Sequence, residues 1–513
     1  MTQNMRENMR ENIVETDVLV AGAGPAGLAT AVAAAAHGAR VLVVERRPGT
    51  STIPRATGIS THTMEIFREW GVAAAVAAGA VDCEPTVAVA RSLVDPHPQV
   101  VPSGFPGRRE ALRASPMTPL LCGQDHIEPV LVDAVRRRGG RVRFDTALTG
   151  LTVRAGGVVA ELGGGERVRA RFVVAADGPR STVREALGVG VEQLGRLGDW
   201  AQVLFRPDLA ELLGRRPHVL WTITHPDAEG VLLPVGGGRW SYARRWDCRT
   251  ERPADFTFER WTTLLRAATG LPRLEPEILG MQLFTMAAAV SDTMRSGPGF
   301  VVGDAAHRMT PVGGAGMNTA IHDGHELGWR LGWVLRGWAG DALLDSFADE
   351  REPVGRARAL RSLRMGEPSP LDGLAGDLGR TYRSTAVLDD GDAPAEGHHR
   401  TARPGERAPH AGVRTRSGSC VADALGPGFT LVTGPEPGAW TAAAAACASP
   451  PVRVVSLRAS QAVARYRLGP ASAVLLRPDG VVAWRSDAPV PATAALRTAV
   501  DRLTARSRSA RAA

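Results

Sequence analysis

The sequence contains no lysine, and all 61 of its basic residues are arginine. Aromatic residues are also scarce, at 5% of 513 positions, and the formal net charge is only +8. The arginines are scattered, and the sequence lacks the basic stripe interleaved with aromatic residues that is typical of nucleic-acid-binding proteins. A nucleic-acid partner is therefore not expected. The length indicates a globular protein with two or three domains.

Cysteine is rare as well. The five cysteines are odd in number and lie far apart, at Cys83, Cys122, Cys248, Cys420 and Cys447. This spacing argues against a disulfide framework, a zinc site and a CxxC redox pair. We therefore expect no bound metal.

The amino terminus lacks the apolar run of a signal peptide. Residues 1–12 repeat Asn-Met-Arg-Glu and are expected to form a polar, disordered tail. The apolar stretch that follows is interrupted by Gly24-Pro25 and flanked by Asp17 and His37, which favours a folded unit over a membrane span. We expect a cytoplasmic protein without a membrane partner.

The first 45 residues predict a nucleotide-binding turn. A strand is expected over residues 17–21, a helix over 28–37 and a second strand over 41–44. The turn after the first strand reads Gly22-Ala23-Gly24-Pro25-Ala26-Gly27. In such a turn the first glycine permits the tight bend, the second lets the backbone approach a pyrophosphate and the third lets the helix pack on the strand. The helix N-terminus favours phosphate, and Glu45 lies where an acid can bond ribose hydroxyls.

A second glycine-rich segment lies far downstream. It reads Gly303-Asp304-Ala305-Ala306-His307, continues to Pro311 and ends in Gly313-Gly314-Ala315-Gly316-Met317-Asn318. One glycine-rich loop is a weak signal. Two of them, the second opening a helix rich in small residues, suggest a cofactor that is held from both ends of one domain. The cofactor that such a pair most often implies is FAD.

The rest of the chain divides into distinct stretches. Short apolar runs separated by Gly, Pro and Asp predict an antiparallel sheet over residues 200–290. Residues 92–119 are rich in proline and are expected to form loops, and residues 388–412 are expected to form a linker. Residues 413–505 are predicted to form a smaller α/β unit, in which the turn Pro478-Asp479-Gly480 joins two strands as a hairpin.

Together these motifs resemble those of class A flavoprotein monooxygenases, the FAD-dependent aromatic hydroxylases of the p-hydroxybenzoate and phenol hydroxylase type. Residues 177–184 (DGPRSTVR) are similar to the D-G-x-x-S-x-x-R motif of that family. Residues 378–384 (LGRTYRS) look like a segment of the subgroup that acts on phenols, polyketides and large natural-product aromatics. Residues 413–505 look like the thioredoxin-like domain of that subgroup.

The resemblance implies an α/β fold with a Rossmann-like FAD-binding domain, an inserted antiparallel-sheet substrate domain and a C-terminal thioredoxin-like domain. The expected bounds are 13–195 and 287–370 for the two-part FAD-binding domain, 196–286 for the substrate-binding sheet, 371–412 for the linker and 413–505 for the C-terminal domain. Because the C-terminal domain lacks a CxxC pair, we expect it to serve structure or assembly. A homodimer is compatible with this organisation.

The resemblance also implies roles for single residues in binding FAD. Asp304 would bond a ribityl hydroxyl, Pro311 would lie near the reactive edge of the flavin, and Arg180 would contact a phosphate or ribose. The expected cofactor-binding set is Gly22, Gly24, Pro25, Ala26, Gly27, Glu45, Arg46, Arg55, Gln124, Asp177, Gly178, Asp304, Pro311, Gly314, Gly316, Met317 and Asn318.

Two positions depart from the family pattern. Ala315 stands where glutamine is common, and His322 stands where glutamine often precedes Asp323. Both departures concern the substrate and flavin-movement side of the resemblance rather than flavin binding.

Four aromatic residues are candidates for lining an aromatic pocket, namely Phe205, Trp221, Trp240 and Tyr242. Trp240 and Tyr242 alternate and so share one face of a predicted strand. Ordinary packing within a sheet explains the same pattern equally well.

The activity expected from the resemblance is that of an FAD-dependent monooxygenase. It would use NADH or NADPH and dioxygen to hydroxylate a phenolic or polyketide-type aromatic through a flavin C4a-hydroperoxide. The cofactor carries this chemistry, so no protein nucleophile is expected, and His307 is interpreted as structural rather than as a base. Two alternatives stay open: Baeyer–Villiger oxygen insertion into a polycyclic ketone or quinone, and a flavin-binding protein without oxygenase turnover.

Overall fold

The structure is a computed structural model that describes residues 13–206, 217–367, 369–388, 401–415, 418–487 and 491–505. The tail over residues 1–12 and residues 389–400 of the expected linker lie outside the described residues. Within the described part of the chain, no helix has both the length and the apolar character needed to cross a membrane.

The N-terminal βαβ unit forms where the sequence predicts it. It consists of β1 (Ile13–Ala21), α2 (Pro25–Ala36) and β2 (Val41–Val44), and β1 pairs in parallel with β2 and with β11 (Arg167–Ala175). The remaining strands of this sheet are β8 (Arg141–Arg143), β9 (Leu148–Arg154), β10 (Gly157–Leu162), β17 (Arg295–Ser296) and β18 (Gly299–Val301). The apolar runs of β1, β2 and β11 are buried because helices cover the sheet.

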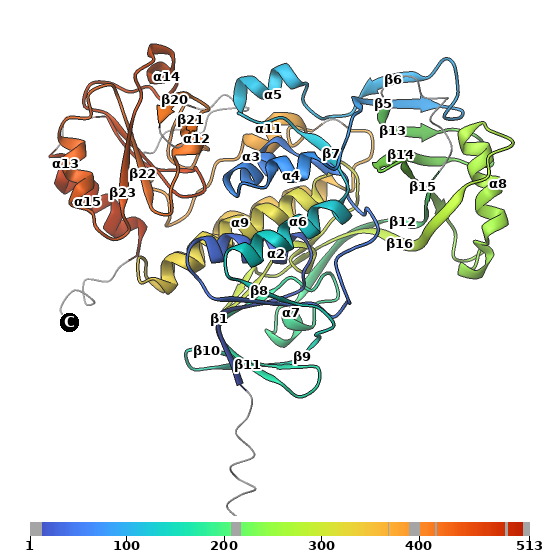
Figure 1. Ribbon diagram of the computed structural model, residues 1–513, viewed down its shortest axis with the longest axis horizontal. Coiled ribbons are helices and arrows are strands. Elements are labelled where there is room, and N and C mark those ends of the chain that lie inside the picture. Colours follow the sequence, from blue (N-terminus) through green and yellow to red (C-terminus); the bar gives the residue numbers. More distant parts are fainter. Residues whose placement is uncertain are drawn as a thin grey trace, which may run out of the picture.

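Helix α9 (Gly316–Leu335) packs along α2, and Figure 1 shows the two helices side by side at the centre of the molecule. Gly324, Gly328 and Gly332 of α9 lie one turn apart and face α2 or its C-cap residue His37. A Cβ at Gly324 would lie 2.5 Å from the backbone nitrogen of Thr30, and a Cβ at Gly328 would lie 2.3 Å from the Cβ of Ala33. The alanine-rich face of α2 and the glycines of α9 therefore set how closely the two helices approach.

The other elements around this core come mainly from the first half of the chain. The helices are α3 (Thr61–Glu69), α4 (Ala73–Ala77), α6 (Gln124–Arg137), α7 (Thr182–Ala186), α10 (Asp345–Arg361) and α11 (Gly373–Leu378). A small sheet contains β3 (Gly58–Ile59), β4 (Ala80–Val81) and β7 (Leu120–Cys122).

The predicted second sheet is present and is larger than expected. Its strands run in the order β19 (His307–Arg308), β16 (Glu277–Ser291), β12 (Val191–Arg206), β15 (Arg239–Trp246), β14 (Gly230–Gly236), β13 (His218–Ile223), β5 (Glu84–Ala90) and β6 (Gln99–Pro102). All pairs are antiparallel except β13 with β5.

The expectation that residues 92–119 form only loops is wrong. This stretch includes β6 and the short helix α5 (Arg108–Ala114). The prolines that suggested loops flank or end these elements, and β6 lies on the edge of its sheet, where proline is tolerated.

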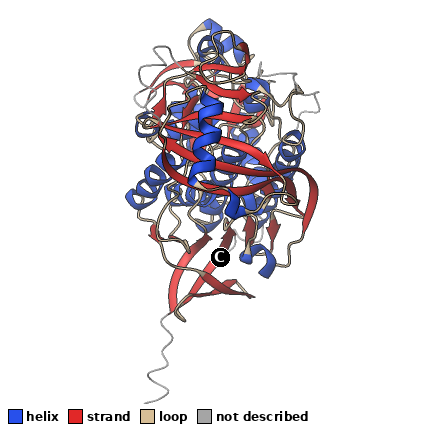
Figure 2. Ribbon diagram, turned by 90° about the vertical axis from the view of Figure 1, so that its right-hand side faces the viewer, coloured by secondary structure: helices blue, strands red, loops and turns tan. Residues whose placement is uncertain are grey.

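Helix α8 (Phe258–Thr269) covers one face of the second sheet, as Figure 2 shows. Its buried residues Trp261, Leu265 and Ala268 pack into a core with the strands beneath them. We call this side of the sheet the outer face and the opposite side the inner face. Figure 1 places the sheet between α8 and the first domain.

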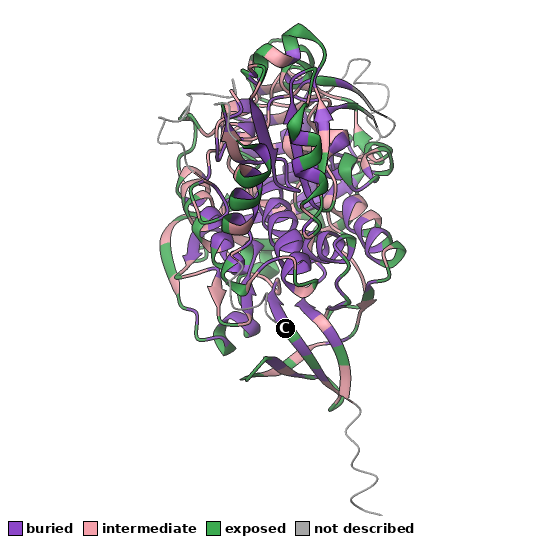
Figure 3. Cartoon of the chain, turned by 90° about the vertical axis from the view of Figure 1, so that its left-hand side faces the viewer, coloured by how far each residue is buried: buried purple, intermediate pink, exposed green. Residues whose placement is uncertain are grey.

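The C-terminal domain has a four-stranded sheet in the order β23 (Val452–Ser456), β22 (Phe429–Thr433), β24 (Ala473–Leu476) and β25 (Val482–Ser486). The predicted hairpin is confirmed, because β24 and β25 pair in antiparallel. The helices are α12 (Val421–Ala424), α13 (Ala439–Ala445), α14 (Ser460–Arg465) and α15 (Ala492–Leu503), and a short ribbon joins β20 (Gly412–Thr415) to β21 (Gly418–Cys420). Figure 3 shows this side of the molecule, with a buried interior beneath an exposed surface.

The turn of that hairpin inserts buried charges into the first domain. Arg477 donates to both carboxylate oxygens of Glu350 on α10, at 2.6 and 2.9 Å, and Asp479 accepts from the indole nitrogen of Trp329 on α9 at 3.1 Å. Arg330 also donates to Glu350. Buried charges of this kind are tolerated only when they are mutually paired, so the hairpin and the two helices require one another.

We predict that Gly328→Ala lowers the free energy of unfolding by about 1–3 kcal/mol, because overpacking a tight contact costs more than alanine's helix preference returns. Denaturation in urea followed by tryptophan fluorescence measures the change. Gly426→Ala is the control, since a Cβ there meets nothing within 4 Å. Equal stability of the two variants would contradict the close α2–α9 contact.

Candidate active site

The first glycine turn packs directly on the Asp177-Gly178 segment. Gly22 has a φ of +105°, and a Cβ there would lie 2.2 Å from the carbonyl oxygen of Ala176. A Cβ at Gly27 would lie 2.0 Å from the carbonyl oxygen of Gly22. Only glycine fits these two positions, and their contacts bring the first and second sequence motifs together.

The third motif joins them at the same place. A Cβ at Gly303 would lie 2.7 Å from the Cβ of Ala26, so the loop that carries Asp304 rests on the start of α2. The guanidinium of the buried Arg184 donates to the carbonyl oxygens of Pro179, at 3.2 Å, and of Ala305, at 3.3 Å. Segments near residues 24, 180 and 304 therefore meet along one edge of the parallel sheet.

Several glycines in these segments face open space. A Cβ at Gly24, Gly314 or Gly316 meets no atom within 4 Å. Gly24 is the N-cap of α2, and among the residues that the structure describes no side chain caps that helix end. A helix N-terminus without a side-chain cap, beside glycines that leave room, suits the phosphates and ring of a dinucleotide. The residues present therefore fit FAD.

Charged side chains gather beside this open space. The side chain of Arg55 is exposed as a whole, but protein atoms around its guanidinium partly desolvate it, and this lowers its pKa. The charge of Arg47 lowers the pKa further, whereas the carboxylates of Glu128, Asp304 and Glu45 act in the opposite direction. Asp304 belongs to the short 3₁₀ turn η2 (Gly303–Ala305) and is open on one side. The protein surrounds its carboxylate on the other sides, and this desolvation raises its pKa.

Two expected contact residues are already bonded within the protein. The carboxylate of Glu45 accepts the backbone N–H groups of Ala23 and Arg47, both at 3.0 Å. The amide of Gln124 donates to Glu128 at 2.6 Å, and burial raises the pKa of Glu128. Glu45 thus shapes the glycine turn directly, and its remaining lone pairs are what a ribose could use.

Asp177 also has partners in the protein. Its carboxylate accepts the hydroxyl of Ser181 and, at 3.3 Å, the backbone N–H of Val183, which caps α7. Burial raises the pKa of Asp177, although these hydrogen bonds lower it. Gly178 faces open space, and Arg180 is exposed.

The loop after Asp304 is held by a fully buried carboxylate on α9. Asp323 accepts the backbone N–H of Gly303 at 3.0 Å, the Nε2 of His307 at 2.6 Å and the Nε of Arg351 at 2.9 Å. Burial alone would raise the pKa of Asp323, but His307 and Arg351 outweigh it and the pKa is lowered. His307 is committed to this contact, in line with its interpretation as a structural residue.

The glycine loop of the third motif is exposed at Pro311 and Gly314 and buried at Met317. Gly314 donates its N–H to the carbonyl oxygen of Pro311 at 3.1 Å, which closes a turn. Asn318 differs from expectation, because its side chain is occupied by protein groups, including the carbonyl oxygen of Gly314 at 3.0 Å. Its amide can therefore act on a flavin only through the loop.

Comparison with known proteins agrees with this geometry. A model of the FAD binding domain matches residues 15–362, and a model of the C-terminal domain of aromatic-ring hydroxylases matches residues 401–507. The chain belongs to the FAD-dependent aromatic-ring hydroxylases. It is a flavin-dependent monooxygenase, and its C-terminal domain is the thioredoxin-like domain of that family.

Similar proteins cover almost the whole chain. Aklavinone 12-hydroxylase RdmE of Streptomyces purpurascens is 38% identical, over 92% of this chain and 96% of its own length. Tetracenomycin A2 monooxygenase-dioxygenase of Streptomyces glaucescens is 35% identical, over 96% and 97%. The crystal structure of aklavinone-11 hydroxylase with FAD and aklavinone matches with a TM-score of 0.87 and 34% identity, over 96% of this chain and all of that one.

The four aromatic candidates lie on the outer face of the second sheet, beneath α8. Phe205, Trp221, Trp240 and Tyr242 are buried in the core under α8, where the hydroxyl of Tyr242 donates to the carbonyl oxygen of Ala228 at 2.9 Å. We therefore correct the prediction that they line a pocket. Alternation along a strand shows which residues share a face but not which face a helix covers, and α8 was not predicted.

The inner face carries a row of polar side chains instead. Gln282 donates its amide to the oxygen of Gln202 at 2.6 Å, and Gln202 donates to the hydroxyl of Ser241 at 2.6 Å. Apolar Trp200 and Met286 lie in a small cluster beside this row. These residues were not predicted, because glutamine and serine in a strand resemble an ordinary solvated face.

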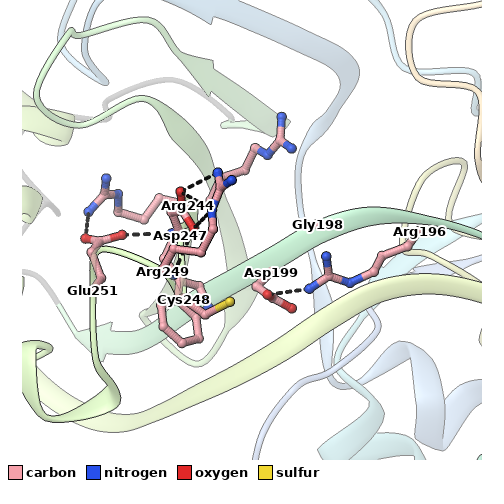
Figure 4. Close-up of a pocket in the computed structure, with 10 residues that line it drawn as sticks. Arg196, Gly198, Asp199, Arg244, Asp247, Cys248, Arg249 and Glu251 are labelled. Atoms are coloured by element: carbon pink, nitrogen blue, oxygen red, sulfur yellow. Dashed lines mark hydrogen bonds and ion pairs between the residues drawn. The ribbon is translucent and has the colours of Figure 1, made fainter.

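A separate hollow lies between the middle of β12 and the C-terminal end of β15, with a volume of about 640 Å³ (Figure 4). Three of its four arginines pair with carboxylates in the same hollow, namely Arg196 with Asp199, Arg249 with Asp247 at 2.8 Å and Arg244 with Glu251 at 3.4 Å. The fourth, Arg245, donates to the carbonyl oxygen of Leu197 at 3.0 Å. None of the expected cofactor-binding residues lines it.

We predict that Gly24→Val weakens FAD binding at least about tenfold while leaving stability unchanged, because the new side chain occupies open space that a pyrophosphate needs and costs about 1–3 kcal/mol there. Flavin fluorescence titration of the apoprotein measures the affinity.

Gly107→Val is the matched control. Gly107 is also an uncapped helix N-cap with extended backbone, and a Cβ there also meets nothing within 4 Å. Equal FAD affinity in the two variants would contradict a cofactor at the start of α2.

Proposed function

We propose that this hydroxylase uses FAD, NADH or NADPH and dioxygen to hydroxylate an aromatic polyketide. The observation that carries the proposal is the meeting of three distant motifs around open glycines, with Arg55 and Asp304 beside them. The relatives support it, since two of them are named for hydroxylation of aklavinone and one was solved with FAD and aklavinone.

We assign the FAD-binding domain to residues 13–195 and 287–370, the substrate-binding sheet to 196–286, the linker to 371–412 and the C-terminal domain to 413–505. The strands β5 and β6 are an addition to the substrate sheet from within the first range. The N-terminus of α2 would hold the pyrophosphate, Glu45 and Arg55 would hold the adenosine side, and Asp304 would bond the ribityl chain. The remaining expected contacts are Arg46 and Gln124, Asp177 with Gly178, and the loop from Pro311 to Met317.

Bound FAD supplies the activation of dioxygen, and the chain supplies position and environment. The loop 311–316 presents backbone with little side-chain bulk, so a flat ring can lie close to it. The inner face of the second sheet would cover the side of the flavin ring that faces away from this loop and exclude water there. Exclusion of water favours oxygen transfer to the substrate over side reactions. No side chain of the chain needs to attack the substrate.

The inner face suits a polycyclic substrate with oxygen atoms along one edge. Gln202 and Gln282 present amide groups that can pair with carbonyl or hydroxyl oxygens, and the neighbouring Trp200 and Met286 offer apolar contact. A phenolic or quinonoid polyketide combines both features.

The deciding experiment measures oxidation of NADPH and NADH by the yellow protein with a panel of polycyclic phenols and quinones, together with product masses. We expect one ligand class to stimulate oxidation and to yield a product heavier by one oxygen atom. The product's ring system then distinguishes hydroxylation from ring insertion. Flavin-loaded protein that no polycyclic aromatic stimulates would contradict the proposal.

We predict that Gln202→Met raises the substrate KM about tenfold, as expected for the loss of one buried polar contact. Initial rates over a range of substrate concentrations measure the change. The control is Tyr242→Phe, which removes a hydrogen bond on the outer face and should leave KM unchanged. A larger effect of Tyr242→Phe would place the substrate on the α8 side.

A further inference from the structure

Four side chains form a continuous hydrogen-bonded relay that ends at the flavin-facing loop. They are Arg380, which follows α11, His322 and Asn318 on α9, and Thr63 on α3. Asn318, His322 and Thr63 are almost fully buried, with 6%, 2% and 0% of their surface exposed. The direction of each hydrogen bond in the relay follows from the chemistry of its ends.

At the loop end, backbone groups fix the orientation of the Asn318 amide. Its nitrogen donates to the carbonyl oxygens of Gly58, at 2.9 Å, and Gly314, at 3.0 Å, while its oxygen accepts the N–H of Ser60 at 2.9 Å. A carbonyl can only accept and an N–H can only donate, so a flipped amide would lose all three bonds. Asn318 is also the one asparagine in the chain after residue 12.

The orientation of the Asn318 amide also determines which groups donate in the hydrogen bonds of Thr63 and His322. The Thr63 hydroxyl lies 2.8 Å from the Asn318 oxygen and must donate to it, because that oxygen has no proton. The same hydroxyl lies 2.9 Å from Nε2 of His322. Since its own proton is committed, it accepts, and Nε2 of His322 must carry a hydrogen.

The far end imposes the same assignment independently. Two guanidinium nitrogens of Arg380 lie 3.1 and 3.2 Å from Nδ1 of His322. Arginine has no acceptor, so Nδ1 must be unprotonated. Both ends thus require one neutral tautomer of His322, with the proton on Nε2.

The surroundings keep the ring neutral. Burial lowers the pKa of His322 well below its usual value, and His62, Arg380, Arg351 and Arg358 act in the same direction. The His62 ring packs edge-on at 4.6 Å between ring centroids, while Glu65, which could offset this, is bonded to His62 and Arg407.

We propose that His322 is a positioning residue: held by Arg380 as its Nε2-protonated tautomer, it directs the Thr63 hydroxyl toward the oxygen of Asn318 and so supports the amide that bonds Gly314 in the loop facing the flavin. This inference rests on the proposed FAD site. It also assigns a role to the segment 378–384. Arg380 of that segment determines the tautomer of His322, which is linked to the loop through Thr63 and Asn318.

A glutamine at position 322 has one accepting oxygen and one donating nitrogen, so it can accept from Arg380 and donate to Thr63 in the same direction. Leucine can do neither. We expect His322→Gln to keep wild-type FAD affinity and His322→Leu to weaken FAD binding about tenfold, as expected for the loss of one buried hydrogen bond.

His325 provides the matched control. It lies one turn further along α9, is similarly buried at 4% exposure and bonds Glu69 at 3.0 Å, with no contact to the loop. His325→Leu should lower stability by a similar amount and leave FAD affinity unchanged.

The tautomer itself is measured by ¹⁵N NMR of histidine-labelled apoprotein, with His322→Gln assigning the signals. We expect one protonated Nε2 and one unprotonated Nδ1 for His322. A protonated Nδ1, or His322→Leu with FAD affinity equal to that of His325→Leu, would overturn the inference. Wild-type protein that takes up no FAD would overturn the proposed cofactor site instead, and the wild-type titration identifies that case.

Discussion

The carboxylate of Asp323 is the contact on which the site depends. It is fully buried, and its three donors come from the Asp304 loop, from His307 beyond it and from Arg351 on α10. Without this carboxylate, the backbone N–H of Gly303 and the Nε2 of His307 would lose their buried acceptor, and Arg351 would lose one of its two buried carboxylate partners, which is strongly unfavourable. The position of Asp304 beside the open glycines therefore depends on Asp323, a fully buried residue of α9.

From Asp323 the buried charges continue to the C-terminal domain. Arg351 also donates to Glu326 and to the hydroxyl of Tyr382, and the neighbouring Glu350 accepts from Arg330 and Arg477. The hairpin of the thioredoxin-like domain thus completes a polar core shared with α9 and α10. This arrangement accounts for a thioredoxin-like domain without a CxxC pair, since its hairpin serves the packing of the flavin-binding domain.

Motifs in which the backbone conformation or a close backbone contact requires a particular residue were predictable from the sequence. Gly22 and Gly27 are required by contacts shorter than any side chain permits, and Asp304 follows a strand at the sheet edge. The faces of the second sheet were not predictable, because Trp240 and Tyr242 carry the same alternation whether a helix or a substrate covers them. Helix α8 decides between these cases, and strands β5 and β6 reach the sheet from a distant part of the chain.

Polar positioning residues were the least visible in the sequence. Asn318 was expected to contact the flavin, yet its amide is saturated by Gly58, Ser60, Thr63 and Gly314. His322 was noted only as a departure from the family pattern, and its partners Thr63 and Arg380 lie far from it in sequence. Such relays depend on three-dimensional proximity of single atoms, which neither periodicity nor motif spacing encodes.

The most direct test of the whole account is a crystal structure of the protein with FAD and a polycyclic aromatic ligand. We predict that the pyrophosphate lies at the N-terminus of α2 and the flavin ring lies against residues 313–316. The ligand should lie between that ring and the inner face of the second sheet, with its oxygen-bearing edge at Gln202. A flavin away from α2, or a ligand in the arginine-lined hollow beside β12 and β15, would contradict this prediction.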